Sequence, residues 1–175
     1  MHKLLCLALL LAASAAHALS DSEKETLMTA AVEAYERQDY ATALEKWRTL
    51  ATAGEAAAQN NLGILYDNGQ GVAQDYAQAR AWYEKAAVQG DADAQYNLGA
   101  LYAEGQVVAQ DYARSAAWWE KAAAQGHTQA QYNLGVLYYN GEGVPRDISK
   151  AREWLEKAAA QGDESAKAAL QKFGK

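Results

Sequence analysis

The sequence predicts an all-α fold of stacked antiparallel helix pairs, and three observations support this prediction. The chain repeats itself with a period of 36 residues over units at about 56–91, 92–127 and 128–163, and a period of this length is typical of helix-pair arrays. Each unit contains two stretches whose apolar residues follow helical spacing. The composition agrees, because the chain has a single proline and half of its residues are hydrophobic, many of them alanine.

The first 18 residues have the layout of a secretory signal peptide. Lys3 gives a positive start, an apolar run follows, and Ala16-His17-Ala18 fits a small-x-small cleavage site. The run is shorter than the about 20 residues that a membrane-spanning helix needs, so we expect cleavage after Ala18 rather than an uncleaved anchor. The only cysteine, Cys6, would leave with this peptide. The mature protein is therefore expected to be periplasmic or secreted, without disulfides and without an integral membrane span.

Shorter helical segments flank the three units. Residues 19–55 fit the same plan with a shorter loop and predict an N-terminal helix pair that divides near Asp39. Residues 164–175 resemble the start of one further unit, with Ala166 and Leu170 in register, but they lack the Asn-Leu-Gly core and are rich in lysine. Such an altered end predicts a capping helix on a stacked array.

Helix A, the first helix of each unit, combines an apolar face with an internal glycine. In the first unit this face comprises Ala58, Leu62, Leu65 and Tyr66, which follow the spacing of a buried helical side. The glycine recurs as Gly63, Gly99 and Gly135, although glycine inside a helix costs about 1 kcal/mol relative to alanine. These glycines lie at the edge of the apolar face, so we expect them to admit close contact with the backbone of a neighbouring helix.

Helix B, the second helix of each unit, follows an aspartate. Its carboxylate can accept hydrogen bonds from the first free N–H groups of the helix, and it recurs as Asp39, Asp75, Asp111 and Asp147. A glycine ends each helix B. The expected caps of the A helices that follow are Asp91, Thr128 and Asp163.

The repeated pattern AQxNLGxLYxxGxGVxxDxxxAxxWYxKAAxQG resembles the Sel-one-like repeat (SLR) family, a relative of the tetratricopeptide repeat. The resemblance covers about residues 56–163, and residues 19–55 resemble a plainer tetratricopeptide unit. It implies a right-handed α-solenoid whose members act as scaffolds or adaptors, in bacteria often secreted or periplasmic. In the second unit Val107 replaces a loop glycine (Gly71 and Gly143 in the others), so this position cannot strictly require a positive φ. A cysteine-rich subgroup linked to penicillin binding is excluded, because the mature chain has no cysteine.

Comparison of the units separates scaffold positions from positions that are free to recognise a partner. A stripe on helix A, opposite the apolar face, differs from unit to unit, and in the implied superhelix the A helices line the concave side. We predict that this concave stripe binds a protein or peptide segment, since tyrosine offers a large contact area and a hydroxyl. The alternative is that its tyrosines pack between adjacent A helices. The predicted partner-binding residues are Asn60, Ile64, Asp67, Asp93, Tyr96, Gln129, Tyr132, Val136 and Tyr139.

Other recurring residues favour structural roles. Trp82, Trp118 and Trp154 recur at one position of helix B, which is typical of packing. Asparagines on helix A flank its core side as Asn61, Asn97 and Asn133. A buried asparagine needs hydrogen-bond partners, and we expect a carbonyl or loop N–H of the neighbouring unit. A role in clamping a bound peptide is the alternative.

Charge and motif content limit the function classes. The formal net charge is −6, which does not fit a nucleic-acid-binding protein. His127 is the only histidine after the leader, no catalytic triad or phosphate loop can be assembled, and no cofactor or metal site is expected. We therefore predict a non-enzymatic, exported scaffold in the bacterial envelope. The alternatives are a binder of peptidoglycan or other cell-wall glycan, with weak hydrolase or β-lactamase-like activity, and self-association through the end helices.

Overall fold

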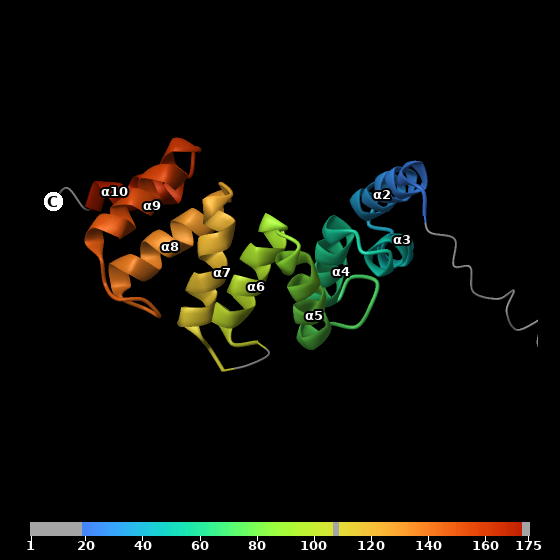
Figure 1. The fold of residues 1–175 in the computed structure, drawn as a ribbon, viewed down its shortest axis with the longest axis horizontal. Helices are drawn as coiled ribbons and strands as arrows, with labels where there is room; N and C mark the ends of the chain where they lie inside the picture. The colour runs from blue at the N-terminus through green and yellow to red at the C-terminus, as the bar shows by residue number, and fades with distance from the viewer. Residues whose placement is uncertain (1–18, 107–108, 173–175) are drawn as a thin grey trace, which may run out of the picture.

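The computed structural model describes residues 19–106 and 109–172, which contain nine α-helices and no strand. The predicted signal peptide and Val107 lie outside these residues. The all-α prediction is confirmed, and Figure 1 shows the helices following one another along the long axis of the molecule. In chain order they are α2 (Asp21–Glu36), α3 (Tyr40–Thr52), α4 (Ala56–Asn68), α5 (Tyr76–Val88), α6 (Ala92–Glu104), α7 (Tyr112–Ala124), α8 (Thr128–Asn140), α9 (Ile148–Ala160) and α10 (Glu164–Lys172).

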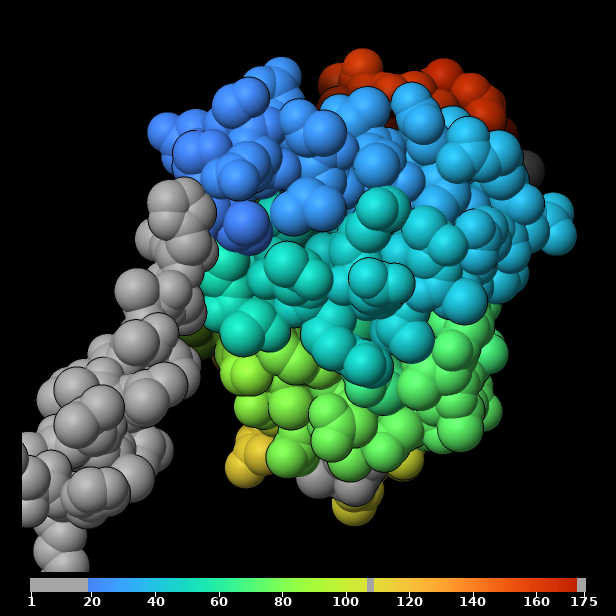
Figure 2. Space-filling view, turned by 90° about the vertical axis from the view of Figure 1, so that its right-hand side faces the viewer, coloured from blue at the N-terminus to red at the C-terminus, as the bar shows by residue number. Residues whose placement is uncertain are grey.

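The helices form a one-dimensional array. Among the described residues, extensive contacts join only helices that follow one another in the chain, as in a solenoid. The even-numbered helices are the A helices and the odd-numbered ones are the B helices. Seen from the N-terminal end, α2 and α3 form the nearest surface and later units lie behind them (Figure 2).

The core is a row of small apolar clusters rather than one large centre. The first cluster contains Trp47, Leu50 and Leu62 from α3 and α4. The last contains Leu155 and Ala166 from α9 and α10. Most of the buried side chains are alanine or leucine, so each unit completes its core only against its neighbours.

Side-chain caps fix where the helices begin. The four predicted aspartates cap the B helices; for example, Asp75 Oδ1 accepts from the backbone N–H of Ala77 at 2.9 Å. Asp91 and Asp163 cap α6 and α10 in the same way. The prediction for Thr128 was wrong, because His127 Nδ1 accepts from the N–H of Ala130 at 3.2 Å and caps α8.

Buried glutamines join successive units, a feature that the sequence analysis did not anticipate. Gln95 is only 5% exposed. Its Nε2 donates to the carbonyl oxygen of Ala87 in the preceding B helix at 3.1 Å, and its Oε1 accepts from Gln125 Nε2 at 2.9 Å. Both polar ends of a buried amide are thus satisfied. The same relay recurs with Gln59 and Gln89, and with Gln131 and Gln161.

The helix A glycines do admit a close neighbour, but that neighbour is a side chain of helix B in the same unit. A Cβ at Gly99 would lie 2.5 Å from Trp119 Cδ1, and one at Gly63 would lie 2.6 Å from Tyr83 Cδ1. At Gly135 the side chain is that of Leu155, whose Cγ would be 2.6 Å away. The predicted close approach is present. The prediction of a backbone neighbour was wrong for Gly63 and Gly99, and at Gly135 an Ala151 carbonyl oxygen lies nearby in addition to the side chain.

Candidate functional site on the A-helix stripe

Three of the predicted stripe residues lie between units. Asn60 is 5% exposed, and its Oδ1 accepts from Asn97 Nδ2 at 3.0 Å. The ring of Tyr96 stacks on His127 at a centroid distance of 4.5 Å. Tyr132 packs against the last apolar cluster of α9 and α10. The stripe position shared by Asn60, Tyr96 and Tyr132 therefore contributes to the contacts between neighbouring helices.

The asparagines of helix A do not share one role. Asn97 has a partner in the preceding unit, as expected, but this partner is the side chain of Asn60 rather than a backbone group. Within the described part of the chain, Asn61 and Asn133 make no side-chain hydrogen bond, and both are half-buried. Asn61 lines a hollow between α2 and α4.

Two hollows occur on the stripe, one near each end of the array. The first has a volume of about 190 Å³ and is lined by Val32, Tyr35, Trp47, Asn61 and Ile64. The second has a volume of about 160 Å³ and is lined by Gly135, Val136, Tyr139, Leu155, Ala169 and Lys172. Each lies between two successive A helices and reaches the B helix between them. Ile64, Val136 and Tyr139 thus line surface cavities.

Asp67 lies on α4 one helical turn beyond Ile64 and is half-buried. Its Oδ2 accepts from the hydroxyl of Tyr83 at 3.1 Å. Burial raises the pKa of Asp67 above its usual value, the Tyr83 hydrogen bond opposes this rise, and the charge of Glu104 adds to it. Burial and the carboxylate of Asp67 together raise the pKa of Tyr83. The equivalents of Asp67 are Ala103 and Tyr139, so the first unit alone has a carboxylate at this position.

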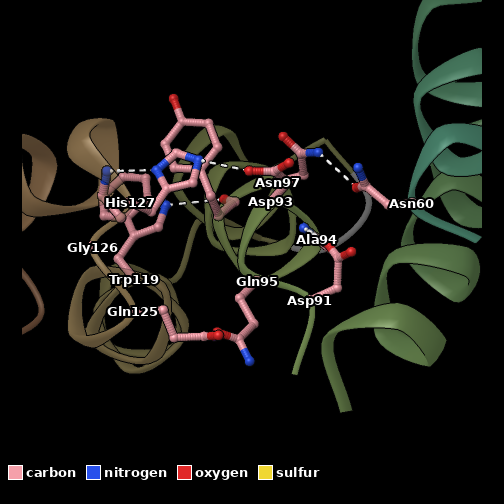
Figure 3. Close-up of polar contacts among 12 residues, drawn as sticks. Asn60, Asp91, Asp93, Ala94, Gln95, Asn97, Trp119, Gln125, Gly126 and His127 are labelled. Atoms are coloured by element: carbon pink, nitrogen blue, oxygen red, sulfur yellow. Dashed lines mark hydrogen bonds and ion pairs between the residues drawn. The ribbon is translucent and has the colours of Figure 1, made fainter. Parts of the chain in front are cut away.

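Asp93 and His127 form a contact between α6 and the residue that caps α8 (Figure 3). Asp93 is exposed, and its Oδ1 lies 3.4 Å from His127 Nε2, while His127 Nδ1 caps α8. Burial lowers the pKa of His127 below its usual value, and the nearby carboxylate of Asp93 partly opposes this shift. Both ring nitrogens therefore take part in contacts that position α8.

The stripe thus divides into packed and accessible residues. Asn60, Tyr96 and Tyr132 lie in contacts between helices. Gln129 is exposed, and Tyr139 is 44% exposed. Together with Ile64, Asp67, Asp93 and Val136, these two residues offer surface to a partner. Their role in binding remains a prediction.

Residues 19–106 and 109–172 were also compared with the requirements of a metal site and of a membrane-spanning helix. Within these ranges, no three histidine, cysteine or acidic residues are grouped so that they could hold a metal ion. Over the same ranges, none of the helices has the length and apolar character needed to cross a bilayer.

A protein-family model for the Sel1 repeat matches residues 56–91, 92–127 and 128–163. The chain belongs to the Sel1 repeat family. Members of this family are typically scaffolds for protein–protein interaction, and the expected resemblance is confirmed. Among curated proteins, no sequence matches the chain.

Solved structures agree with this assignment. A Sel1 repeat protein from Oxalobacter formigenes is 36% identical, with a TM-score of 0.78 over 82% of this chain and 59% of that protein. A protective antigen of uropathogenic Escherichia coli with an SLR fold is 44% identical, with a TM-score of 0.68 over 70% of this chain. This Sel1 repeat protein spans only 26% of that antigen's length. Cysteine-rich protein B of Helicobacter pylori, at 20% identity and a TM-score of 0.55 over 85% of this chain and 96% of that protein, shares the fold.

Proposed function

We propose that this Sel1 repeat protein is an exported, non-enzymatic adaptor that binds a protein or peptide partner in the bacterial envelope. The observation that carries the proposal is the pair of hollows between A helices, each lined by stripe residues that differ between units. Ile64 lines the first hollow, and Val136 and Tyr139 line the second. The signal-peptide pattern of residues 1–18 supports export to the periplasm or beyond.

Each repeat has buried positions that stay constant and accessible positions that vary, and this difference supports a binding function. Residues that recur in every unit, such as Gln95 and Leu98, are buried in the scaffold. The accessible positions vary, with Asp67, Ala103 and Tyr139 at equivalent places. A constant scaffold that presents a variable surface is what recognition of a particular partner requires.

Site-specific photo-crosslinking in living cells tests this proposal. A photoreactive amino acid at position 64 or 136 should capture a defined envelope protein, whereas the same group at Glu156 on α9 should not. The captured chain is then identified and purified, and its affinity is measured. Ile64→Asp and Val136→Asp should weaken binding, because each places a charge in a half-buried apolar wall, while Glu156→Gln should not.

Two other results would overturn the adaptor proposal. Retention of the protein on purified peptidoglycan sacculi, without a cross-linked protein partner, would favour the glycan-binding alternative. Loss of binding in Glu156→Gln equal to that in Ile64→Asp would show that the stripe is not the contact surface. Light scattering of the purified chain reports self-association separately.

A further inference from the structure

The A and B helices of the three repeats carry opposite charge. The A helices α4, α6 and α8 contain Asp67, Asp93 and Glu104 and no lysine or arginine. The B helices contain both signs with an excess of cations, namely Arg80, Lys85, Arg114, Lys121, Lys150, Arg152 and Lys157 against Glu84, Glu120, Glu153 and Glu156. The charged residues of these A helices are therefore all acidic, and they belong to α4 and α6, because α8 has no charged residue.

Several cations of the B helices are held on their own face. Lys85 lies over the ring of Trp82, with Nζ 3.7 Å from the ring centroid. Lys121 and Lys157 lie over Trp118 and Trp154 in the same way, at 3.8 and 4.1 Å. These contacts keep the lysines beside their tryptophans on the B helices. The carboxylates of α4 and α6 can attract a cationic partner.

The carboxylate of Asp67 lies one helical turn along α4 from the apolar hollow between α2 and α4, where it accepts from the hydroxyl of Tyr83. Ile64 lines that hollow, and residues three apart on a helix are neighbours on its surface, so Asp67 follows the hollow by one turn of α4. Glu104 is the exposed last residue of α6, and its charge acts on Asp67. An apolar cavity and a carboxylate one helical turn away therefore occur on the same helix, α4.

The hollow has room for one side chain and has an unmet hydrogen-bonding group in its wall. A cavity of about 150 Å³ can hold a benzene ring, and this hollow has a volume of about 190 Å³. Trp47, which lines it, is 3% exposed, and its Nε1–H has no acceptor among the described residues. Its equivalent Trp119 donates to the carbonyl oxygen of Tyr96 at 3.0 Å. Trp47 therefore has an unpaired donor where its equivalent has a paired one.

We propose that the α2–α4 hollow together with Asp67 and Glu104 docks a cationic peptide segment, in which a leucine- or phenylalanine-sized side chain is adjacent to a lysine or arginine. The apolar side chain enters between Val32, Trp47 and Ile64, and the cation lies against the two carboxylates. This inference rests on the proposed adaptor function and names the chemistry of the partner at its N-terminal hollow.

The C-terminal hollow provides a matched comparison within the same chain. It has similar volume, but Lys172 is among its lining residues and no acidic residue is. Arg146 also lies near it, because its guanidinium is 5.7 Å from the ring of Tyr139. A cationic segment should therefore bind more tightly at the N-terminal hollow than at the C-terminal one.

Three short fluorescein-labelled peptides test the inference by fluorescence polarisation with the mature full-length protein. The first peptide has two Leu-Lys repeats at its centre. The second has Leu-Glu and the third has Ser-Lys at the same positions, and the rest of the sequence is identical. The Leu-Lys peptide should bind about tenfold more tightly than either, since each of the others lacks one half of the proposed recognition. Raising the salt concentration from about 0.05 M to about 0.3 M should weaken its binding, because the Debye length shortens.

Variants of the protein locate the site. Asp67→Asn combined with Glu104→Gln should weaken Leu-Lys binding about tenfold, while the amide oxygen introduced at position 67 can still accept from Tyr83 and preserve the fold. Ile64→Ser should also weaken it, whereas the matched Val136→Ser at the other hollow should change affinity less than about twofold. Circular dichroism melts confirm that each variant is folded.

Equal binding of the Leu-Lys and Leu-Glu peptides, or of wild type and the double variant, would overturn the inference, as would no binding of any peptide. These outcomes are distinguishable from failure of the adaptor function. A partner cross-linked at position 64 that binds the double variant as tightly as wild type would refute the cationic chemistry and retain the adaptor. Absence of any cross-link from both hollows would refute both.

Discussion

Replacing Gly99 by alanine provides a direct test of the contact between helix A and helix B. The new Cβ would lie 2.5 Å from Cδ1 and Nε1 of Trp119. Trp119 is 6% exposed, and its Nε1 donates to the carbonyl oxygen of Tyr96. The ring cannot move away from the methyl group without disturbing both its packing and this hydrogen bond.

The expected magnitude follows from three opposing contributions. Alanine gains about 1 kcal/mol over glycine in helix propensity. Overpacking of a filled core costs about 1–3 kcal/mol, and loss of the Trp119 hydrogen bond costs about 0.5–1.5 kcal/mol more. We therefore expect Gly99→Ala to lower the free energy of unfolding by about 1–3 kcal/mol, which lowers the Tm by roughly 2–4 °C for each kcal/mol in a chain of this size.

Urea unfolding followed by circular dichroism measures this change, and a double-mutant cycle assigns its cause. In a Trp119→Ala background the added methyl group meets open space, so the same Gly99→Ala change should cost little or become stabilising. The reasoning is refuted if Gly99→Ala is as stable as wild type, or if its cost is the same with and without the Trp119 ring.

Three further predictions concern single side chains. His127 should make stability pH-dependent: burial lowers its pKa, so the unfolded state takes up a proton first, and the stability present above about pH 6.5 is lost as the pH falls toward the lower folded-state pKa. His127→Asn keeps a capping side chain that does not titrate, so the Tm of the wild type should fall relative to that of this variant on acidification; a difference in Tm that does not change with pH would contradict the assignment. Ser115 is fully buried with an unpaired Oγ and has alanine equivalents, so Ser115→Ala should leave the free energy of unfolding unchanged or raise it by up to about 1 kcal/mol, and a loss in urea unfolding would show a hidden partner. Gln95→Leu should lower the free energy of unfolding by about 1–3 kcal/mol, since it leaves the Ala87 carbonyl unpaired, whereas the exposed Gln106→Leu should have little effect.

The sequence was sufficient to place the helices, because apolar spacing and capping aspartates act locally. The exception at α8 shows where this local reasoning fails. His127 stands where the junctions before α6 and α10 have aspartate, and threonine is a more common helix cap than histidine, so residue preference alone favours Thr128. Alignment of the 36-residue units predicts the cap correctly, since His127 occupies the same position as Asp91 and Asp163.

The stripe was harder to predict, because a helical wheel considers one helix at a time. The wheel places Asn60, Tyr96 and Ile64 on the same outward side of helix A. In the array, residues on that side also face the adjacent units, which bury Asn60 and stack His127 on Tyr96. Only a three-dimensional arrangement distinguishes these residues from Ile64, whose side chain lines a hollow.

The buried glutamines have a consequence for how such a gene can change in length. Gln59, Gln95 and Gln131 each bond to a carbonyl eight residues earlier in the chain. If recombination removed residues 92–127, Gln131 would meet the Ala87 carbonyl in the place of Ala123, and no buried amide at the splice would lose its partner. Gain or loss of a whole 36-residue period therefore rebuilds a complete junction, so natural selection can adjust the number of units without redesigning any interface.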